Sequence, residues 1–511
     1  MLQRYLDQLG GFFDRLSSDK IPFCYVILTF FAAAVLRTFA EHVFLASVPP
    51  VFWGEDLAHY TLSYVALALT LILFLHAVAG DPIMRAARIV LPGFILLNTV
   101  PLIDRLLGVQ DVHHIAYFLS DSSADLLVSF LTFFGPLQAW GVTPGMRVEI
   151  AVVMCVIGLY IFHRTRLIQR AVTGAFLFYV LIFSYVATPF WIKGVMGFCS
   201  FSKELDSWLL VHWYVVLVTI LSTIVLYLLR RDVFKAIVED MRVSRLVHYL
   251  LFILLGFLFY RRAGIFPVSM DREFFFRAFF LIMGVSAAWL FSVITNNEAD
   301  RDIDRISNPD RPSVSGAVSA ELYRRIGWGS FCCAGFFAFM AGIKEFEIVL
   351  VFMATYFLYS MPPLRLKRVP VLSKFVIGIN SLLMFMLGYG FVVNRITVSP
   401  GIVVFFLIFL AAAANFIDLK DHDGDAKAGI RTLSGLIGLS MARKIVGGIF
   451  ILTYLAAWVV FDLAGCFWVC LSAGVLQYIL INRGQYDERP VFVVHLLSLV
   501  FILSYVMMAP R

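Results

Sequence analysis

Long apolar runs recur along almost the whole chain, and this pattern most restricts what the chain can fold into. Six of them lie before residue 230, near 22–46, 60–79, 88–107, 148–163, 171–192 and 208–229. Nine more follow, near 247–262, 273–296, 323–342, 346–360, 371–393, 400–417, 444–462, 464–482 and 491–509. An α-helix needs about 20 mostly apolar residues to cross the hydrocarbon core of a bilayer. We therefore predict an all-α integral membrane protein with many crossings.

The composition excludes the main soluble classes of protein. Hydrophobic residues make up 61% of the 511 residues and charged residues only 15%. A soluble domain averages about 45–50% apolar and about 25% charged residues, so a soluble enzyme, a secreted disulfide scaffold and a disordered chain are excluded. The formal net charge of +7 is spread over short segments between the apolar runs. Because a nucleic-acid surface needs clustered basic residues, we expect no nucleic-acid partner.

A short polar stretch divides the apolar runs into two groups. Residues 231–245 contain Arg231, Lys235, Arg242 and Arg245. We predict an N-terminal polytopic membrane domain of unknown role over 1–230, a basic cytoplasmic linker over 231–245 and a second membrane domain over 246–511. The loops after 296, 360, 417 and 482 are rich in lysine and arginine, and the positive-inside rule places them in the cytoplasm.

Two stretches of the first half do not have the pattern of membrane spans. Leu2, Leu6, Leu9, Phe13 and Leu16 fit a short amphipathic helix that lies on the membrane surface. Residues 110–140 are expected to lie at the outer face or to re-enter the membrane, because a full crossing would move the basic segment 163–170 to the outside.

Two acidic clusters interrupt the apolar background, each at the end of an apolar run. The first, with i, i+4, i+8 spacing, consists of Asn296, Asp300 and Asp304. The second, with i, i+3, i+7 spacing, consists of Asp418, Asp421 and Asp425. Both spacings keep the side chains on one face of an α-helix. Carboxylates at membrane depth must be paired, hydrated or metal-bound, and a few carboxylates combined with substrate phosphates suit Mg²⁺. The alternative is that both clusters are hydrated caps of surface loops.

The two clusters resemble the two signatures of the UbiA superfamily of intramembrane prenyltransferases. The pattern N-x-x-x-D-x-x-x-D is met by Asn296, Asp300 and Asp304. The pattern D-x-x-G-D-x-x-x-G-x-x-T-L is met by Asp421, Gly424, Asp425, Gly429, Thr432 and Leu433. The chain departs from the family at Asn297, where the family often has aspartate, and at Ser434, where it often has proline. The resemblance covers about 240–511.

A third, looser match lies between the two signatures. The stretch YSMPPLRLKR, from Tyr359 to Arg368, is similar to the family's loop in which a tyrosine is followed by a lysine. Lys367 is the preferred equivalent of the family's basic residue, and Arg365 is the alternative.

The resemblance implies a fold, an activity and a cofactor. The fold is a nine-helix UbiA-like prenyltransferase bundle, preceded by an additional membrane domain of about six helices. The activity is Mg²⁺-dependent transfer of a polyprenyl group from an isoprenoid diphosphate to a lipophilic acceptor. That acceptor is an aromatic or quinone precursor, a glycerol-phosphate lipid, a tetrapyrrole or an activated sugar. The cofactor is a pair of Mg²⁺ ions that bridge the diphosphate.

The resemblance also assigns roles to single residues. The catalytic metal ligands are Asp300, Asp304, Asp421 and Asp425, and Asn296 binds metal or diphosphate. Phosphate recognition favours basic groups, so the candidate diphosphate contacts are Arg311, Lys367, Lys420 and Arg431. For Lys420 and Arg431, ordinary positive-inside topology is an equal alternative. Asp418 is a supporting ligand or a base that acts on the acceptor.

The expected partners are the isoprenoid diphosphate donor, the lipophilic acceptor and membrane lipid, with a protein partner binding through 1–230 left open. The competing function is a non-enzymatic membrane transporter or scaffold that retains the prenyltransferase fold. Mg²⁺-dependent release of diphosphate from a prenyl diphosphate distinguishes the two.

Overall fold

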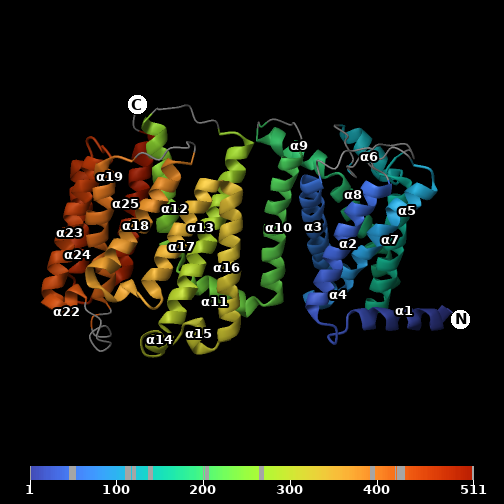
Figure 1. The fold of residues 1–511 in the computed structure, drawn as a ribbon, viewed down its shortest axis with the longest axis horizontal. Coiled ribbons are helices and arrows are strands. Elements are labelled where there is room, and N and C mark those ends of the chain that lie inside the picture. Colours follow the sequence, from blue (N-terminus) through green and yellow to red (C-terminus); the bar gives the residue numbers. More distant parts are fainter. Residues whose placement is uncertain are drawn as a thin grey trace. The chain divides into compact units, whose positions relative to one another are not determined.

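The computed structural model describes residues 2–44, 53–109, 117, 122–135, 142–199, 201, 206–263, 270–391, 398–420, 422 and 432–508. Within these residues every regular element is a helix and no strand occurs. Twelve of the described helices are long and apolar enough to cross a membrane. The prediction of an all-α integral membrane protein with several crossings is confirmed. The chain divides into two compact units, Met1–Arg231 and Asp232–Arg511 (Figure 1).

The long helices of the first unit carry its apolar runs. They are α2 (Phe23–Phe44), α3 (Trp53–Ala79), the succession α4 (Ile83–Gly93), η2 (Phe94–Asn98) and α5 (Thr99–Leu106), then α7 (Pro144–Thr165), α8 (Ile168–Val186) and α10 (Ser207–Leu229). The shorter elements are α1 (Leu2–Leu16), α6 (Ser123–Leu131) and α9 (Thr188–Phe198). At nine residues α6 is too short to cross a bilayer. Most of the remainder of 110–140 lies outside the described residues, so its expected re-entrant path stays a prediction.

The first helix lies across the ends of α4 and α7 rather than parallel to them (Figure 1). Its Phe13 ring is 5% exposed and packs edge-on against Tyr160, with the ring centroids 5.0 Å apart. Asp14 accepts a hydrogen bond from Arg85 at 2.7 Å. α1 is thus held to the unit by apolar and ionic contacts, and its expected position on the membrane surface stays a prediction.

The second unit begins with a short helix and continues through long ones. Its long elements are α12 (Val243–Ala263), α13 (Arg272–Ala299), α16 (Ala320–Ala341), α17 (Ile343–Ser360), α18 (Pro370–Tyr389), the run Pro400–Leu419, α23 (Leu439–Val460), α24 (Phe467–Ile481) and α25 (Glu488–Met508). Its short elements are α11 (Arg231–Asp240), α14 (Arg301–Ser307), α15 (Pro312–Ser315), η3 (Leu366–Arg368) and α22 (Leu433–Ile437). The helices that follow the two acidic motifs, α14 and α22, lie at the same end of this unit (Figure 1).

Glycines let α12 and α18 approach closely at the centre of the second unit. A Cβ atom at Gly388 would lie 1.7 Å from the carbonyl oxygen of Ile253, and one at Gly256 would lie 2.0 Å from that of Phe385. Small residues allow close backbone contact between membrane helices, where dispersion replaces the hydrophobic effect as the main attraction. This crossing fixes α12 beside α18 and thereby places one wall of the cavity described below.

The run Pro400–Leu419 changes its helical type along its length. It begins as α19 (Pro400–Val404), widens into the π-helix η4 (Phe405–Leu410), passes through α20 (Ala411–Ala413) and ends as the 3-10 helix η5 (Ala414–Leu419). π-Helical and 3-10 segments inside a longer helix often mark functional sites. Here they position Asp418 at the end of the run.

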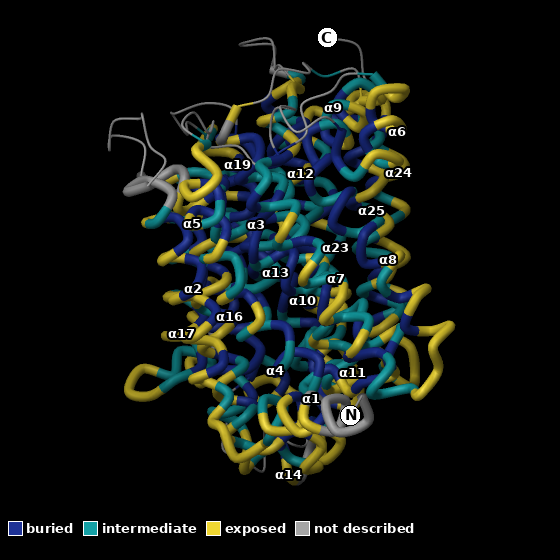
Figure 2. Tube along the Cα trace, turned by 90° about the vertical axis from the view of Figure 1, so that its right-hand side faces the viewer, coloured by how far each residue is buried: buried dark blue, intermediate teal, exposed yellow. Residues whose placement is uncertain are grey.

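Apolar side chains cover the outer helices. On α24 the exposed residues recur at successive turns (Figure 2) and include Trp468, Val469, Leu476 and Ile479. In a protein of this hydropathy such a surface is the one that contacts lipid tails.

Candidate active site

The first acidic cluster lies where α13 ends. The Asp300 amide donates to the Asn296 carbonyl at 3.0 Å, and the Asp304 amide donates to the Asp300 carbonyl at 2.8 Å, so the helical turn continues into α14. Asn296 Oδ1 and Asp300 Oδ2 both accept hydrogen bonds from Lys367 Nζ, at 3.1 and 2.5 Å. The two oxygens therefore converge on a single cationic atom.

Both basic residues considered for the loop after α17 contact Asp300. Besides the Lys367 ammonium, the Arg365 guanidinium donates to Asp300 Oδ1 at 3.2 Å and to the carbonyl of Ala299. Burial lowers the pKa of Lys367, and the neighbouring Asp300 opposes that shift. The loop thus places two cationic side chains, Arg365 and Lys367, beside the Asp300 carboxylate at the end of α13.

Asp304 has different partners from Asn296 and Asp300. Its carboxylate is 3% exposed, forms an ion pair with Arg311 and accepts a hydrogen bond from Asn308 Nδ2 at 3.1 Å. Burial raises the pKa of this carboxyl group, and Arg311 opposes the shift. The structure therefore brings Asn296, Asp300 and Lys367 together, and pairs the predicted diphosphate contact Arg311 with Asp304.

A buried polar network that sequence reasoning missed surrounds the next residue, Asn297. Its amide nitrogen donates to both carboxylate oxygens of Asp240, at 3.0 and 2.9 Å, and to the Tyr323 hydroxyl at 3.0 Å. Its amide oxygen accepts from Arg242 at 3.1 Å and from Arg311 at 2.9 Å. Asn297 and Tyr323 are both 0% exposed. Burial lowers the pKa of Arg242 to about 10.

Of the three aspartates in the second acidic cluster, the structure describes only Asp418. Asp418 accepts a hydrogen bond from Lys374 Nζ at 2.6 Å, and the lysine is 5% exposed. Asp421, Asp425 and Arg431 lie outside the described residues. Among the residues that the structure does describe, no three histidine, cysteine or acidic side chains gather as a metal site.

Lys420, a predicted diphosphate contact, has an acidic partner of its own. It pairs with Glu488 at 2.6 Å and is not among the residues that line the cavity.

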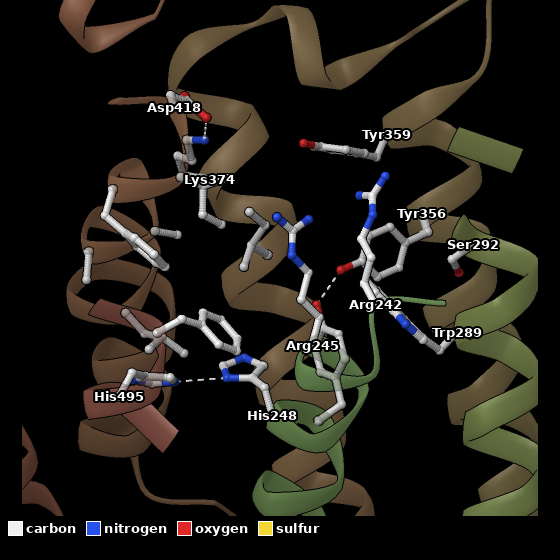
Figure 3. Close-up of a pocket in the computed structure, with 18 of the residues that line it drawn as sticks. Arg242, Arg245, His248, Trp289, Ser292, Tyr356, Tyr359, Lys374, Asp418 and His495 are labelled. Atoms are coloured by element: carbon white, nitrogen blue, oxygen red, sulfur yellow. Dashed lines mark hydrogen bonds and ion pairs between the residues drawn. The ribbon is translucent and has the colours of Figure 1, made fainter. Parts of the chain in front are cut away.

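A cavity of about 170 Å³ lies between α12, α13, α17, α18, the run Pro400–Leu419, α23 and α25. Its polar wall contains the cations of Arg242, Arg245 and Lys374 and the carboxylate of Asp418. Both guanidinium groups point toward the end where Tyr359 and Asp418 lie, and His248 and His495 lie at the other end (Figure 3). The remaining wall is mostly apolar and includes Trp289, Tyr356, Ile377, Leu410, Phe416, Phe450 and Phe492.

Arg242 and Arg245 belong to the stretch expected to be a linker. Instead, this stretch forms α11 and the start of α12, and both arginines line the cavity. Arg242, Arg245 and Tyr249 are spaced i, i+3, i+7, which puts them on one face of a helix. This spacing is the signal in the sequence that could have located them.

Apolar space continues beyond the polar cavity. A narrow second cavity of about 40 Å³ shares Leu410, Ala413, Phe450 and His495 with the first. A third, of about 280 Å³, shares Tyr454, Ser498 and Ile502 with the second. The three cavities thus lie next to one another with some lining residues in common, and away from the polar wall they are lined mainly by aliphatic and aromatic side chains.

Residues 249–502 match the model of the UbiA prenyltransferase family. The C-terminal half of the chain belongs to this family. The resemblance inferred from the two acidic signatures is confirmed.

Several UbiA-family relatives are similar to this chain. A digeranylgeranylglyceryl phosphate synthase of Haloquadratum walsbyi is 28% identical over 223 residues, which are 41% of this chain and 74% of that protein. A homogentisate phytyltransferase of Synechocystis sp. is 31% identical over 173 residues, 30% of this chain and 55% of that protein. The chlorophyll synthase of Arabidopsis thaliana is 30% identical over 172 residues, 32% of this chain and 44% of that protein. The chain therefore spans about half the length of the Synechocystis phytyltransferase and of the Arabidopsis chlorophyll synthase.

A solved structure of a UbiA homolog from Archaeoglobus fulgidus bound to GPP and Mg²⁺ covers 53% of this chain and 99% of that chain, with 20% identity and a TM-score of 0.44.

The UbiA-family match begins inside α12, after several of the residues described above. Asp240, Arg242, Arg245 and His248 all precede residue 249, where the match starts. Part of the cavity wall and part of the Asn297 network of this UbiA-family unit therefore come from residues outside the matched region.

Proposed function

We propose that this chain is a divalent-metal-dependent membrane prenyltransferase that transfers a prenyl group from an isoprenoid diphosphate to a lipophilic acceptor. The observation that carries the proposal is the cavity between α12, α13, α18 and the run Pro400–Leu419. Three cationic side chains and one carboxylate line its polar wall, and aromatic and aliphatic side chains line the rest. An anionic head group with an apolar tail matches both walls.

The residues at the end of α13 fit a divalent cation. Asn296 Oδ1 and Asp300 Oδ2 already converge on the Lys367 ammonium, and hard oxygen ligands of this kind are what Mg²⁺ binds. Asn296 and Asp300 would hold one ion, which Asp304 would join on releasing Arg311 to the diphosphate. Asp421 and Asp425, supported by Asp418, would hold a second. Bound Mg²⁺ supplies positive charge that stabilises the leaving diphosphate.

The remaining charged side chains have roles of their own. With Asn296 and Asp300 engaged by metal, Lys367 is free to donate to the diphosphate. Arg242 and Arg245, whose guanidinium groups point toward the same end of the cavity (Figure 3), neutralise further negative charge as the carbon–oxygen bond breaks. Such preorganised charge is usually the largest catalytic contribution in chemistry of this kind.

The apolar wall protects the reactive prenyl group. Trp289, Tyr356 and Phe450 face the cavity, and their ring faces attract a cation such as the allylic carbon centre. The same side chains exclude the water that would otherwise capture it. The neighbouring apolar cavities, one of which Phe450 also lines, would receive the isoprenoid tail. We place the acidic motifs on the cytoplasmic side, as the basic loops around them predict.

The test measures diphosphate release by the full chain in lipid nanodiscs supplied with geranylgeranyl diphosphate. We expect release that requires Mg²⁺, stops with EDTA and resumes when Mg²⁺ is restored. Asp300→Asn and Asp421→Asn should each reduce the rate by at least about 100-fold, the size expected for loss of an electrostatic catalytic group.

Asp302→Asn is the matched control. Asp302 lies two residues from Asp300, and its side chain is 92% exposed and forms an ion pair with Arg305. Mg²⁺-independent release, or full activity in both the Asp300 and Asp421 variants, would overturn the metal scheme. No release from the unaltered chain would favour the transporter or scaffold.

A further inference from the structure

Two histidines meet inside the membrane cavity, and the proposed function uses neither. His248 lies on α12 and His495 on α25, and His248 Nδ1 is 2.9 Å from His495 Nε2 (Figure 3). His495 lines both the polar cavity and the narrow apolar cavity beyond it. A molecule that enters the polar cavity therefore reaches this ring at the point where the polar wall ends.

The hydrogen bonds fix where each histidine carries its proton. The Ser381 hydroxyl has one proton and donates it to the Ile377 carbonyl at 2.9 Å. Its oxygen must then accept from His248 Nε2, which is 3.3 Å away. A neutral imidazole with a proton on Nε2 has a bare Nδ1, so His248 Nδ1 accepts from His495 Nε2.

In this series of hydrogen bonds the lone pair of His495 Nδ1 is not used. His495 carries its proton on Nε2, so its Nδ1 is unprotonated and can accept a proton. Within the described residues nothing donates a hydrogen bond to that nitrogen. Ser381 and His248 hold the tautomer of His495, which is how a second residue orients a histidine base.

We propose that His495 is the base that removes the proton from the acceptor, and that the acceptor attacks through a hydroxyl group, whose proton this base takes. This inference rests on the proposed prenyl transfer. The acceptor oxygen forms a bond to C1 of the prenyl group, while the bond from C1 to the diphosphate oxygen breaks and leaves its electron pair on the diphosphate. The hydroxyl proton moves to His495 Nδ1, and the products are an ether, diphosphate and an imidazolium that later returns the proton to water.

Asp418, the base considered from the sequence, is less suited to this step. Its carboxylate already accepts a hydrogen bond from the Lys374 ammonium at 2.6 Å, and this bond occupies one of its oxygens. His495 is neutral in the chain of hydrogen bonds described above and has a lone pair available.

The test uses the full chain in nanodiscs with geranylgeranyl diphosphate and Mg²⁺, and two acceptor probes. 1-O-Hexadecylglycerol offers hydroxyl groups, and homogentisate offers an activated aromatic carbon. We expect ether formation with the first probe and no alkylation of the aromatic carbon of the second. His495→Asn places an oxygen near the Nδ1 position and keeps a hydrogen-bond acceptor there without the basicity.

In that variant kcat for ether formation should fall by at least about 100-fold, the usual contribution of a general base. The KM for hexadecylglycerol and the release of diphosphate to water should be retained. His248→Asn, which keeps an acceptor for His495 Nε2, should retain much more activity than His248→Phe. Ser504→Ala, on the same helix as His495 but outside the cavities, is the control for changes in α25.

Independent evidence comes from ¹⁵N shifts of the labelled histidine side chains, assigned by the two variants. We expect unprotonated Nδ1 on both rings in the resting protein. A protonated His495 Nδ1, unchanged transfer in His495→Asn, or alkylation of homogentisate but not hexadecylglycerol would each overturn the inference while leaving the proposed function intact. Absence of Mg²⁺-dependent diphosphate release from the unaltered chain would overturn the proposed function and the inference with it.

Discussion

Asn297 lies at the centre of a buried cluster whose charges balance. Asp240 and Asp304 contribute two carboxylates, and Arg242 and Arg311 contribute two guanidinium groups, around an uncharged amide. Asn297→Asp changes one nitrogen to oxygen with almost no change in volume. The cluster then carries a net negative charge, and the new carboxylate faces Asp240 where the amide nitrogen was 2.9 Å from one carboxylate oxygen.

The size of the effect follows from the contacts that are lost. The two N–H groups of the amide donate to Asp240, whose two oxygens share one of them, and to Tyr323. A hydrogen bond to a charged group contributes about 1.5–3 kcal/mol. The new carboxylate keeps its contacts with Arg242 and Arg311, which offsets part of this loss. We expect Asn297→Asp to lower the free energy of unfolding by about 3–5 kcal/mol, the range measured when a buried ionic group loses its partner.

The reciprocal exchange Asp240→Asn with Asn297→Asp restores both the charge balance and the donor–acceptor pairing. The unfolding of all four proteins, from the unaltered chain to the double variant, would be measured in mixed micelles as the fraction of SDS rises. We expect the double variant to recover about 2 kcal/mol relative to the sum of the single changes, within the range of coupling between contacting residues. If the two effects add to within about 0.5 kcal/mol, the pairing of Asn297 with Asp240 is not what stabilises the cluster.

Three further predictions concern other contacts. Gly388→Val should abolish monodisperse protein in detergent, because a Cβ there would lie 1.7 Å from a carbonyl oxygen of α12, whereas Gly448→Val, with nothing within 4 Å, should be tolerated. Phe13→Ala should weaken the docking of α1 on Tyr160 by about 3–5 kcal/mol and expose the segment between α1 and α2 to protease; equal resistance of the variant would refute this anchor. Lys374→Met removes one of the three cations on the cavity's polar wall. A charge-assisted hydrogen bond from it to the diphosphate would contribute about 1.5–3 kcal/mol, so the KM for the prenyl diphosphate should rise at least tenfold; an unchanged KM would argue against a role in donor binding.

The positions of the membrane helices could be predicted because a local rule determines them. Lipid offers backbone groups no hydrogen-bonding partner, so each long apolar run must satisfy its own amides and carbonyls as a helix. Predicted runs such as 273–296 and 400–417 accordingly lie within α13 and the run Pro400–Leu419. The proximity of Asn296 to Asp300 is equally local, since four residues make about one helical turn.

Contacts between helices could not be predicted in this way. His248 and His495 are 247 residues apart in the sequence, and nothing in either segment indicates the other. Asp300 is likewise bound by Lys367 and Arg365, which lie 67 and 65 residues further along the chain. Which partner a charged side chain finds depends on how helices cross, and that is fixed by packing at positions such as Gly388, where no charge is involved.

The departure of this chain from the UbiA signature at Asn297 has a physical reason that lies outside the signature. An aspartate at that position would face the carboxylate of Asp240, which belongs to α11 and precedes the family match. With asparagine at position 297, the carboxylate at this place is that of Asp240 on α11. The guanidinium groups of Arg242 and Arg311 are then balanced by the carboxylates of Asp240 and Asp304. A domain that started at residue 249 would lack Asp240, Arg242, Arg245 and His248. It would lose half of the charged side chains around Asn297, namely Asp240 and Arg242. It would also lose two of the three cations on the cavity's polar wall, Arg242 and Arg245. The second compact unit begins within α11, and the substitution at Asn297 is understood only together with that helix.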